Sequence, residues 1–193
     1  EFFCNKDVNF EKYIVSELKY FIEKNNCWIN LMKDKNLIYI HSYEESFFNR
    51  SRYKSFFNKT FFKKELSDLN FEICNQKYSG ICDHLILDNL DRIIKDKKNN
   101  FIIFLTVNNH IPVEPVYNIS YIDCNKNFPL NISEQFCKIY NNQMLFNESI
   151  SKFINRMNKN DLLVFFSDTP PMFASKRRVH FEDLIDVYFF TKK

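Results

Sequence analysis

Three stretches of the chain repeat apolar residues at the three- to four-residue spacing of an amphipathic helix. The predicted helices run from Glu11 to Lys24, from Asp83 to about Lys97, and from Ser133 to about Met157. We expect Asp83 to cap the second helix and Asn99 to end it. The buried face of the third is expected to hold Phe136, Ile139, Tyr140, Gln143, Ile150, Phe153, Ile154 and Met157.

Short continuous apolar runs lie between these helices and predict strands. They are Leu37 to Ile40, Phe101 to Val107, Leu162 to Phe166 and Ile185 to Phe190. Leu37 to Ile40 and Leu162 to Phe166 read as buried strands, and Phe101 to Val107 is typical of a central strand in a covered parallel sheet. Helices alternating with such strands predict a layered α/β fold, with a largely parallel central sheet flanked by helices.

Polar residues follow three of the apolar runs directly. His41 follows the first, His110 comes after the second, and Asp168 lies two residues beyond the third. In open α/β sheets the ligand binds beyond the carboxyl ends of the strands, so these residues are candidates for one site. The alternative is that loops at strand ends are polar in any protein.

The composition is that of a folded protein with no strong charge bias. The chain has 193 residues, 45% of them hydrophobic, with 27 basic and 24 acidic residues and a formal charge of +3. This charge balance argues neither for nor against nucleic acid, and we expect no nucleic acid partner. The chain opens at Glu1 without a signal sequence, so we interpret it as a fragment, with any membrane anchor in a missing N-terminal part.

Six cysteines lie at positions 4, 27, 74, 82, 124 and 137. Two sequence-local couples, Cys74 with Cys82 and Cys124 with Cys137, fit short disulfide loops in an exported protein. Six unpaired thiols in a cytosolic protein is the alternative. Because no pair has CxxC spacing and histidine is scarce, a structural zinc site is not expected.

The segment from Ile38 to Phe57 resembles sulfatase-like enzymes of the alkaline phosphatase superfamily, among them lipoteichoic acid synthases and phosphoglycerol transferases. In that family a strand ends in His and an aromatic-Asn-Arg trio follows. The resemblance places these residues at His41, Phe48 and Arg50, where they would line a pocket for a phosphorylated head group. A guanidinium pairs with phosphate or sulfate oxygens through two hydrogen bonds, and an imidazole can donate to the same anion.

Two later segments extend the resemblance. Phe104 to Pro115 is similar to the family's Thr-x-Asn-x-His-x-Pro segment, so His110 would contact substrate near the metal. Leu162 to Phe181 resembles the final metal motif, and Asp168 matches its metal-ligating Asp. Thr169 stands where the family has a His ligand, and a neutral hydroxyl binds a divalent ion poorly.

The resemblance implies a divalent metal, zinc or manganese, and a Thr, Ser or modified Cys nucleophile. The nucleophile segment best matches Tyr13 to Leu18, where Ser16 is the only ordinary hydroxyl, and the first acidic ligand would precede Glu1. Cys74 and Cys82 also match a close disulfide of the phosphoethanolamine transferases.

We therefore expect residues 1–193 to form one partial sulfatase-like domain with an alkaline-phosphatase-like fold, incomplete at the N-terminus. The expected function is hydrolysis or transfer of phospho- or sulfo-esters of envelope glycans or lipids, at the periplasmic or extracytoplasmic face of the membrane. An inactive relative that binds an anionic small molecule, glycan or lipid head group is the first alternative. An unrelated α/β protein is the second.

Overall fold

The computed structural model describes residues 27–32, 34–74, 80–95, 99–110, 113–114, 116, 121–123, 134–166 and 187–191. The chain divides into two compact units, residues 1–149 and 150–193. The single domain expected over the whole chain stays a prediction. The helix predicted over Glu11 to Lys24 lies outside the described residues.

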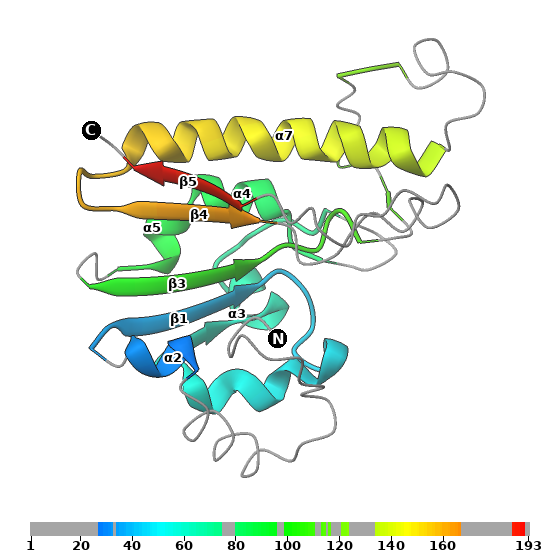
Figure 1. Ribbon diagram of the computed structural model, residues 1–193. Helices are drawn as coiled ribbons and strands as arrows, with labels where there is room; N and C mark the ends of the chain where they lie inside the picture. The colour runs from blue at the N-terminus through cyan, green and yellow to red at the C-terminus, as the bar shows by residue number, and fades with distance from the viewer. Residues whose placement is uncertain are drawn as a thin grey trace, which may run out of the picture. The chain divides into compact units, whose positions relative to one another are not determined.

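Three parallel strands form the sheet of the first unit (Figure 1). They are β1 (Asn36–His41), β2 (Lys59–Phe61) and β3 (Asn100–Leu105), in the order β2-β1-β3. The predicted strands at 37–40 and 101–107 are thus present, but β1 is the central strand of the described sheet and β3 is only half-buried. The register pairs His41 with Leu105, so β1 and β3 end side by side.

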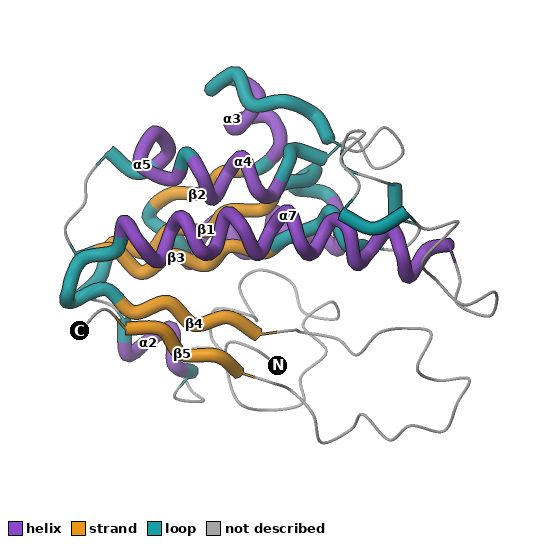
Figure 2. The backbone as a smooth tube through the Cα atoms, turned by 90° about the horizontal axis from the view of Figure 1, so that it is seen from above, coloured by secondary structure: helices purple, strands orange, loops and turns teal. Residues whose placement is uncertain are grey.

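Apolar side chains cover both faces of this sheet. Leu37 and Tyr39 point to one face, where they pack with residues of α2 (Trp28–Leu31) and Phe57, which follows η2 (Phe47–Phe56). Ile38 and Ile40 point to the other face, which is covered by α3 (Lys63–Ser67), α4 (Asp83–Asp88) and α5 (Leu90–Ile93). Figure 2 shows α2 on one side of the strands and α3, α4 and α5 on the other. The alternation of side chains along β1 therefore builds two cores, as a covered parallel sheet requires.

The helix predicted from Asp83 to Lys97 is interrupted. α4 ends at Asp88, and α5 begins at Leu90 after Asn89, whose ψ of 25° leaves the helical range. The Asn89 side chain donates to the carbonyl of Leu85 at 3.0 Å. Such side-chain bonds to the backbone compete with regular helix, which explains the break.

The buried positions in the first-unit part of α7 (Glu134–Arg156) are mostly polar. Cys137, Asn141, Asn142 and Ser149 are buried, whereas Tyr140 is 36% exposed. The prediction that Tyr140 lies on the buried face is therefore wrong. The prediction also missed the four buried positions, Cys137, Asn141, Asn142 and Ser149. Asn141 and Asn142 use their amides to bind the loop after β3, as described below.

β4 (Leu162–Phe166) and β5 (Val187–Thr191) form an antiparallel pair in the second unit. Both strands were predicted to within two residues at each end. The prediction that β4 is buried is wrong at Leu162 and Val164, which are 60% and 39% exposed. These two positions share one face, since side chains alternate along a strand.

Asparagine takes the backbone conformations that glycine usually takes. The sequence contains one glycine, and Asn49, Asn70 and Asn99 have φ values of 53°, 59° and 56°. Asparagine tolerates this left-handed region better than other side chains.

Cys74 and Cys82 form a disulfide, as predicted. Cys27 and Cys137 are disulfide-bonded as well, so six unpaired thiols is the wrong alternative. Cys124, the partner predicted for Cys137, lies outside the described residues. In the described part of the chain, no helix is long and apolar enough to cross a membrane.

Candidate functional site

His41 is the last residue of β1 and is 1% exposed. Its Nδ1 lies 3.1 Å from the carbonyl oxygen of Leu105, its register partner at the end of β3. A carbonyl only accepts, so Nδ1 carries the proton and donates it to Leu105. In the neutral ring Nε2 therefore holds a lone pair, and this buried atom has no hydrogen-bond partner among the described residues.

The pKa of His41 is lowered from 6.5 to about 4, mainly by burial. The positive charge of Arg50 and, to a smaller extent, His110 contribute to this lowering, while the bond to Leu105 acts in the opposite direction. The ring is thus neutral at pH 7. The sequence led us to expect an imidazole that donates to an anion, but the neutral ring presents an acceptor at Nε2.

Phe47 contacts both imidazoles at the strand ends. Its ring is nearly parallel to that of His41, with centroids 6.2 Å apart, and meets the ring of His110 edge-on at 5.5 Å. The aromatic predicted at the site is the next residue, Phe48. It lies in η2, and its side chain is outside the described set.

Arg50 lies on η2, and its side chain is held by the hydroxyl of the buried residue Tyr39. Its guanidinium donates from one terminal nitrogen to the Tyr39 hydroxyl at 3.0 Å. The ring of Tyr39 is itself fixed against Phe57 and Phe62, with centroids at 5.1 and 5.9 Å. Because a guanidinium has five N–H donors, the bond to Tyr39 orients the cation and leaves it able to pair with an anion.

His110 is exposed and lies in the loop that follows β3. Its backbone N–H donates to the carbonyl of Val107 at 2.9 Å. A side chain of α7 also holds this loop. Asn142 donates to the carbonyls of Asn108 and Glu114 and accepts from the N–H of Val116.

A buried carboxylate joins the ends of β1 and β3. Asp83 is 3% exposed and accepts from the Ser42 hydroxyl at 2.5 Å and from the N–H groups of Val107 and Asn108 at 2.8 and 2.7 Å. Burial raises the pKa of Asp83 to about 6, against the effect of these three hydrogen bonds. The sequence suggested a helix cap, but Asp83 is the first residue of α4 and its side chain binds other segments.

Three of the predicted site residues, His41, Arg50 and His110, therefore meet at the carboxyl ends of β1 and β3. Asp168 and Thr169 lie outside the described residues, as do Tyr13 to Leu18. The sequence missed Phe47, Tyr39 and Asp83. The sequence marked Asp83 as the start of a predicted helix, three residues after the single glycine, Gly80.

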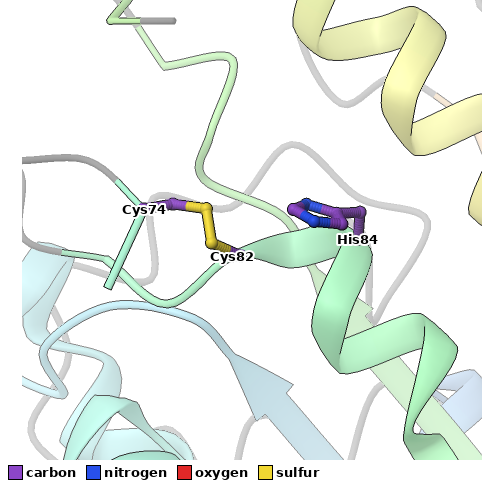
Figure 3. A group of neighbouring side chains, drawn as sticks. All are labelled: Cys74, Cys82 and His84. Atoms are coloured by element: carbon purple, nitrogen blue, oxygen red, sulfur yellow. A yellow bond between two sulfur atoms is a disulfide. The ribbon is translucent and has the colours of Figure 1, made fainter. Parts of the chain in front are cut away.

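Cys74, Cys82 and His84 are the one group of three potential metal ligands close together in the described part of the chain, with ligand atoms within 4.8 Å of one another (Figure 3). Zinc and copper bind cysteine as the thiolate. The two sulfurs are bonded to each other in a disulfide, so they lack that charge.

The described part of the site fits an anion better than a metal ion. Arg50 places a permanent positive charge beside His41, and like charge opposes cation binding. A metal would supply a Lewis acid for the reacting ester, with Asp168 as its predicted ligand.

The chain is similar to known proteins in sequence and in fold. The sulfatase family model matches residues 5–183. Enzymes of that family usually depend on a metal ion. No curated protein sequence gives a significant match.

Several solved structures share the fold, and three of them illustrate the likeness. The lipoteichoic acid synthase LtaP from Listeria monocytogenes has 14% identity and a TM-score of 0.59, over 82% of this chain and 40% of that one. The Streptococcus pyogenes phosphoglycerol transferase GacH, in complex with sn-glycerol-1-phosphate, has 18% identity and a TM-score of 0.62, over 87% and 46%. An alkaline phosphatase superfamily protein from Vibrio parahaemolyticus has 17% identity and a TM-score of 0.53, over 74% of this chain and 35% of that one.

The chain spans less than half the length of each of these three structures. The likeness confirms the predicted α/β, alkaline-phosphatase-like fold with its parallel sheet flanked by helices. An unrelated α/β protein is therefore the wrong alternative. Since the family model covers most of the sequence, the chain belongs to the sulfatase family of the alkaline phosphatase superfamily.

Proposed function

We propose that this chain is the substrate-binding part of a sulfatase-family enzyme that hydrolyses or transfers phospho- or sulfo-esters of envelope glycans or lipids. The observation that carries the proposal is the meeting of His41, Arg50 and His110 at neighbouring strand ends. Strand ends are where parallel α/β sheets bind ligands. A guanidinium beside the strand-end imidazole suits a phosphate or sulfate group.

The three side chains would bind different groups of the ligand. Arg50 pairs with the anionic oxygens, and exposed His110 contacts the same group from the loop after β3. Neutral His41 offers the Nε2 lone pair, which accepts a hydrogen bond from a hydroxyl. These groups would suit a phosphorylated or sulfated alcohol, with the ester group at Arg50 and a hydroxyl at His41.

The relative GacH was crystallised with sn-glycerol-1-phosphate, which belongs to this chemical class. We take that molecule as the probe. Phe48 and Asp168 keep their proposed roles in ligand and metal binding. The disulfides at Cys27, Cys74, Cys82 and Cys137 support a location at the extracytoplasmic face of the membrane, because disulfides persist in oxidising compartments.

Calorimetric titration of the chain with sn-glycerol-1-phosphate tests the proposal, with glycerol and inorganic phosphate as comparison ligands. We expect the ester to bind more tightly than either comparison ligand. Arg50→Ala should weaken binding about tenfold or more, since a charge-assisted pair is lost. Arg52→Ala removes the same charge from the same helix and should have little effect. Equal affinity for glycerol and its phosphate ester contradicts the proposal.

Thr169 favours a second candidate, a domain that binds the ester without converting it, because threonine replaces a histidine metal ligand of the family. Release of p-nitrophenol from its phosphate and sulfate esters, with added zinc or manganese, separates the two. Turnover supports the enzyme. Binding without turnover, together with turnover by Thr169→His, identifies a decayed site.

A further inference from the structure

The segment from Gly80 to Asp83 lies between the ends of β1 and β3. Its Ile81 N–H donates to the carbonyl of Ser42 at 2.7 Å, immediately after β1. A Cβ atom at Gly80 would lie 2.9 Å from Val107 Cγ1 and 3.4 Å from the Ser42 carbonyl oxygen. Only glycine fits so close an approach, which places the single glycine of the sequence between the two strand ends.

Asp83 completes the connection with its carboxylate. One oxygen accepts from Ser42, and the other accepts from the N–H groups of both Val107 and Asn108. The backbone N–H of Asp83 in turn donates to Asn108 Oδ1 at 2.7 Å. Four hydrogen bonds thus join α4 to the residue after β1 and to the loop after β3.

Both histidines of the site are close in sequence to the residues that Asp83 binds. Ser42 directly follows His41. The N–H of His110 donates to the carbonyl of Val107, whose own N–H is held by Asp83. A change at the carboxylate is therefore transmitted through the backbone to His41 on one side and to His110 on the other.

Asp83 is 3% exposed, and both of its carboxylate oxygens already accept hydrogen bonds from Ser42, Val107 and Asn108, so we assign it no direct contact with a ligand. A buried backbone N–H group without an acceptor destabilises the fold. If the Asp83 carboxylate were removed, the loop after β3 would therefore leave its position. Binding groups must be held to a fraction of an ångström to act together.

We propose that Asp83 is a positioning residue that sets the distance between the His41 and His110 imidazoles by joining Ser42 to the backbone of Val107 and Asn108. Its effect on ligand affinity rests on the function proposed above, but its effect on the two imidazoles does not.

Two substitutions separate hydrogen bonding from charge. Asp83→Asn keeps the shape: its amide oxygen accepts from Val107 and Asn108, and its NH₂ donates to Ser42, whose hydroxyl also accepts. Asp83→Ala leaves both backbone N–H groups without their acceptor. Asp68→Ala, at an exposed position after α3, is the matched control.

Assigned NMR spectra of the full chain give the first measurement. We expect Asp83→Ala to shift the ring signals of His41 and His110 and to speed amide exchange at Val107 and Asn108 about tenfold or more. Asp83→Asn should keep the exchange rates near wild type. Unmoved histidine signals in Asp83→Ala overturn the proposal, as does an equal disturbance by both variants.

Affinity for sn-glycerol-1-phosphate is the second measurement. It should fall about tenfold in Asp83→Ala and stay within about twofold in Asp83→Asn. If wild-type protein does not bind the ester, the proposed function fails while the NMR result still decides the role of Asp83. If Asp83→Ala does not fold, Ser42→Ala replaces it: the amide signals of Val107 and Asn108 should move through the shared carboxylate, and their constancy overturns the proposal.

Discussion

His41 donates from Nδ1 to the carbonyl of Leu105 at 3.1 Å, and the sheet register pairs the same two residues. The register of two parallel strands therefore fixes the tautomer of the histidine. Because Nδ1 is committed to the carbonyl, the catalytic and binding options of the ring are those of Nε2.

The depressed pKa of His41 makes its contribution to stability depend on pH. The unfolded ring takes a proton near pH 6.5 and the folded ring near pH 4. The unfolded state thus binds more protons within this window, so the His41 contribution falls as pH decreases from about 6.5 to about 4. Its size is at most about 3 kcal/mol.

The contribution of Asp83 to stability depends on pH in the opposite direction. Its pKa is about 6 in the folded state and 3.8 as the ordinary value, so the folded state binds more protons between them. Its contribution is present at low pH and is lost as pH rises toward 6. In wild-type protein the two groups offset each other across nearly the same range.

Single substitutions should uncover each contribution. We expect His41→Asn to lose stability as pH rises from about 4 to about 6, and Asp83→Asn to lose stability as pH falls through the same range. Urea unfolding at several pH values measures both. Parallel pH profiles in the two variants would contradict the assignment, and an NMR titration of the His41 ring checks its pKa directly.

Tyr39→Phe tests the orientation of Arg50. The phenylalanine keeps the packing against Phe57 and Phe62 but removes the hydroxyl that accepts from the guanidinium. We expect affinity for sn-glycerol-1-phosphate to fall about three- to tenfold, with a loss of about 1 kcal/mol in the free energy of unfolding. Tyr140→Phe, on the exposed side of α7, is the control. Unchanged affinity in Tyr39→Phe would show that the hydroxyl does not orient Arg50.

Gly80→Ala tests the close approach beside Val107. The new methyl group would lie 2.9 Å from Val107 Cγ1, on a short, stiff side chain, and 3.4 Å from the Ser42 carbonyl oxygen. We expect a loss of about 1–3 kcal/mol in the free energy of unfolding, the usual cost of overpacking. Val107→Ala makes room for the methyl group, so the double variant should be more stable than the sum of the two single changes predicts. Additive losses would contradict steric crowding as the cause.

The sequence predicted the features that depend on local patterns. The apolar runs identified β1, β3, β4 and β5, and the residues after two of them identified His41 and His110. β2 was missed because it has three residues, Lys59 to Phe61, and no apolar run. Its position follows from pairing with β1, which local sequence does not encode.

The features that depend on buried polar groups escaped prediction. Helical periodicity selects apolar residues, but the α7 residues that hold the loop after β3 are Asn141 and Asn142. Asp83 has the local pattern of a helix cap, while its partners Ser42 and Val107 are 41 and 24 residues away in sequence. Only the tertiary fold brings such groups together, because an unpaired buried polar group is too costly to keep.

Asn142→Ala tests how firmly α7 holds the loop that carries His110. Asn142 is 5% exposed, and its amide makes three hydrogen bonds to that loop, to Asn108, Glu114 and Val116. Removing the amide leaves three backbone groups without this partner, those of Asn108 and Val116 in buried bonds and that of Glu114 in a partly buried one. We expect a loss of about 2–4 kcal/mol in the free energy of unfolding, larger than for one ordinary hydrogen bond.

The matched control for that change is Asn147→Ala on the same helix. Asn147 is exposed and accepts one surface hydrogen bond from Gln143, so its loss should change stability by no more than about 0.5 kcal/mol. Urea unfolding compares the two, and amide exchange locates the effect. Faster exchange in Asn142→Ala should be strongest at Val116, whose N–H loses its acceptor. Similar stability losses in both variants would mean that the effect reflects helix propensity, and α7 would then not anchor the His110 loop.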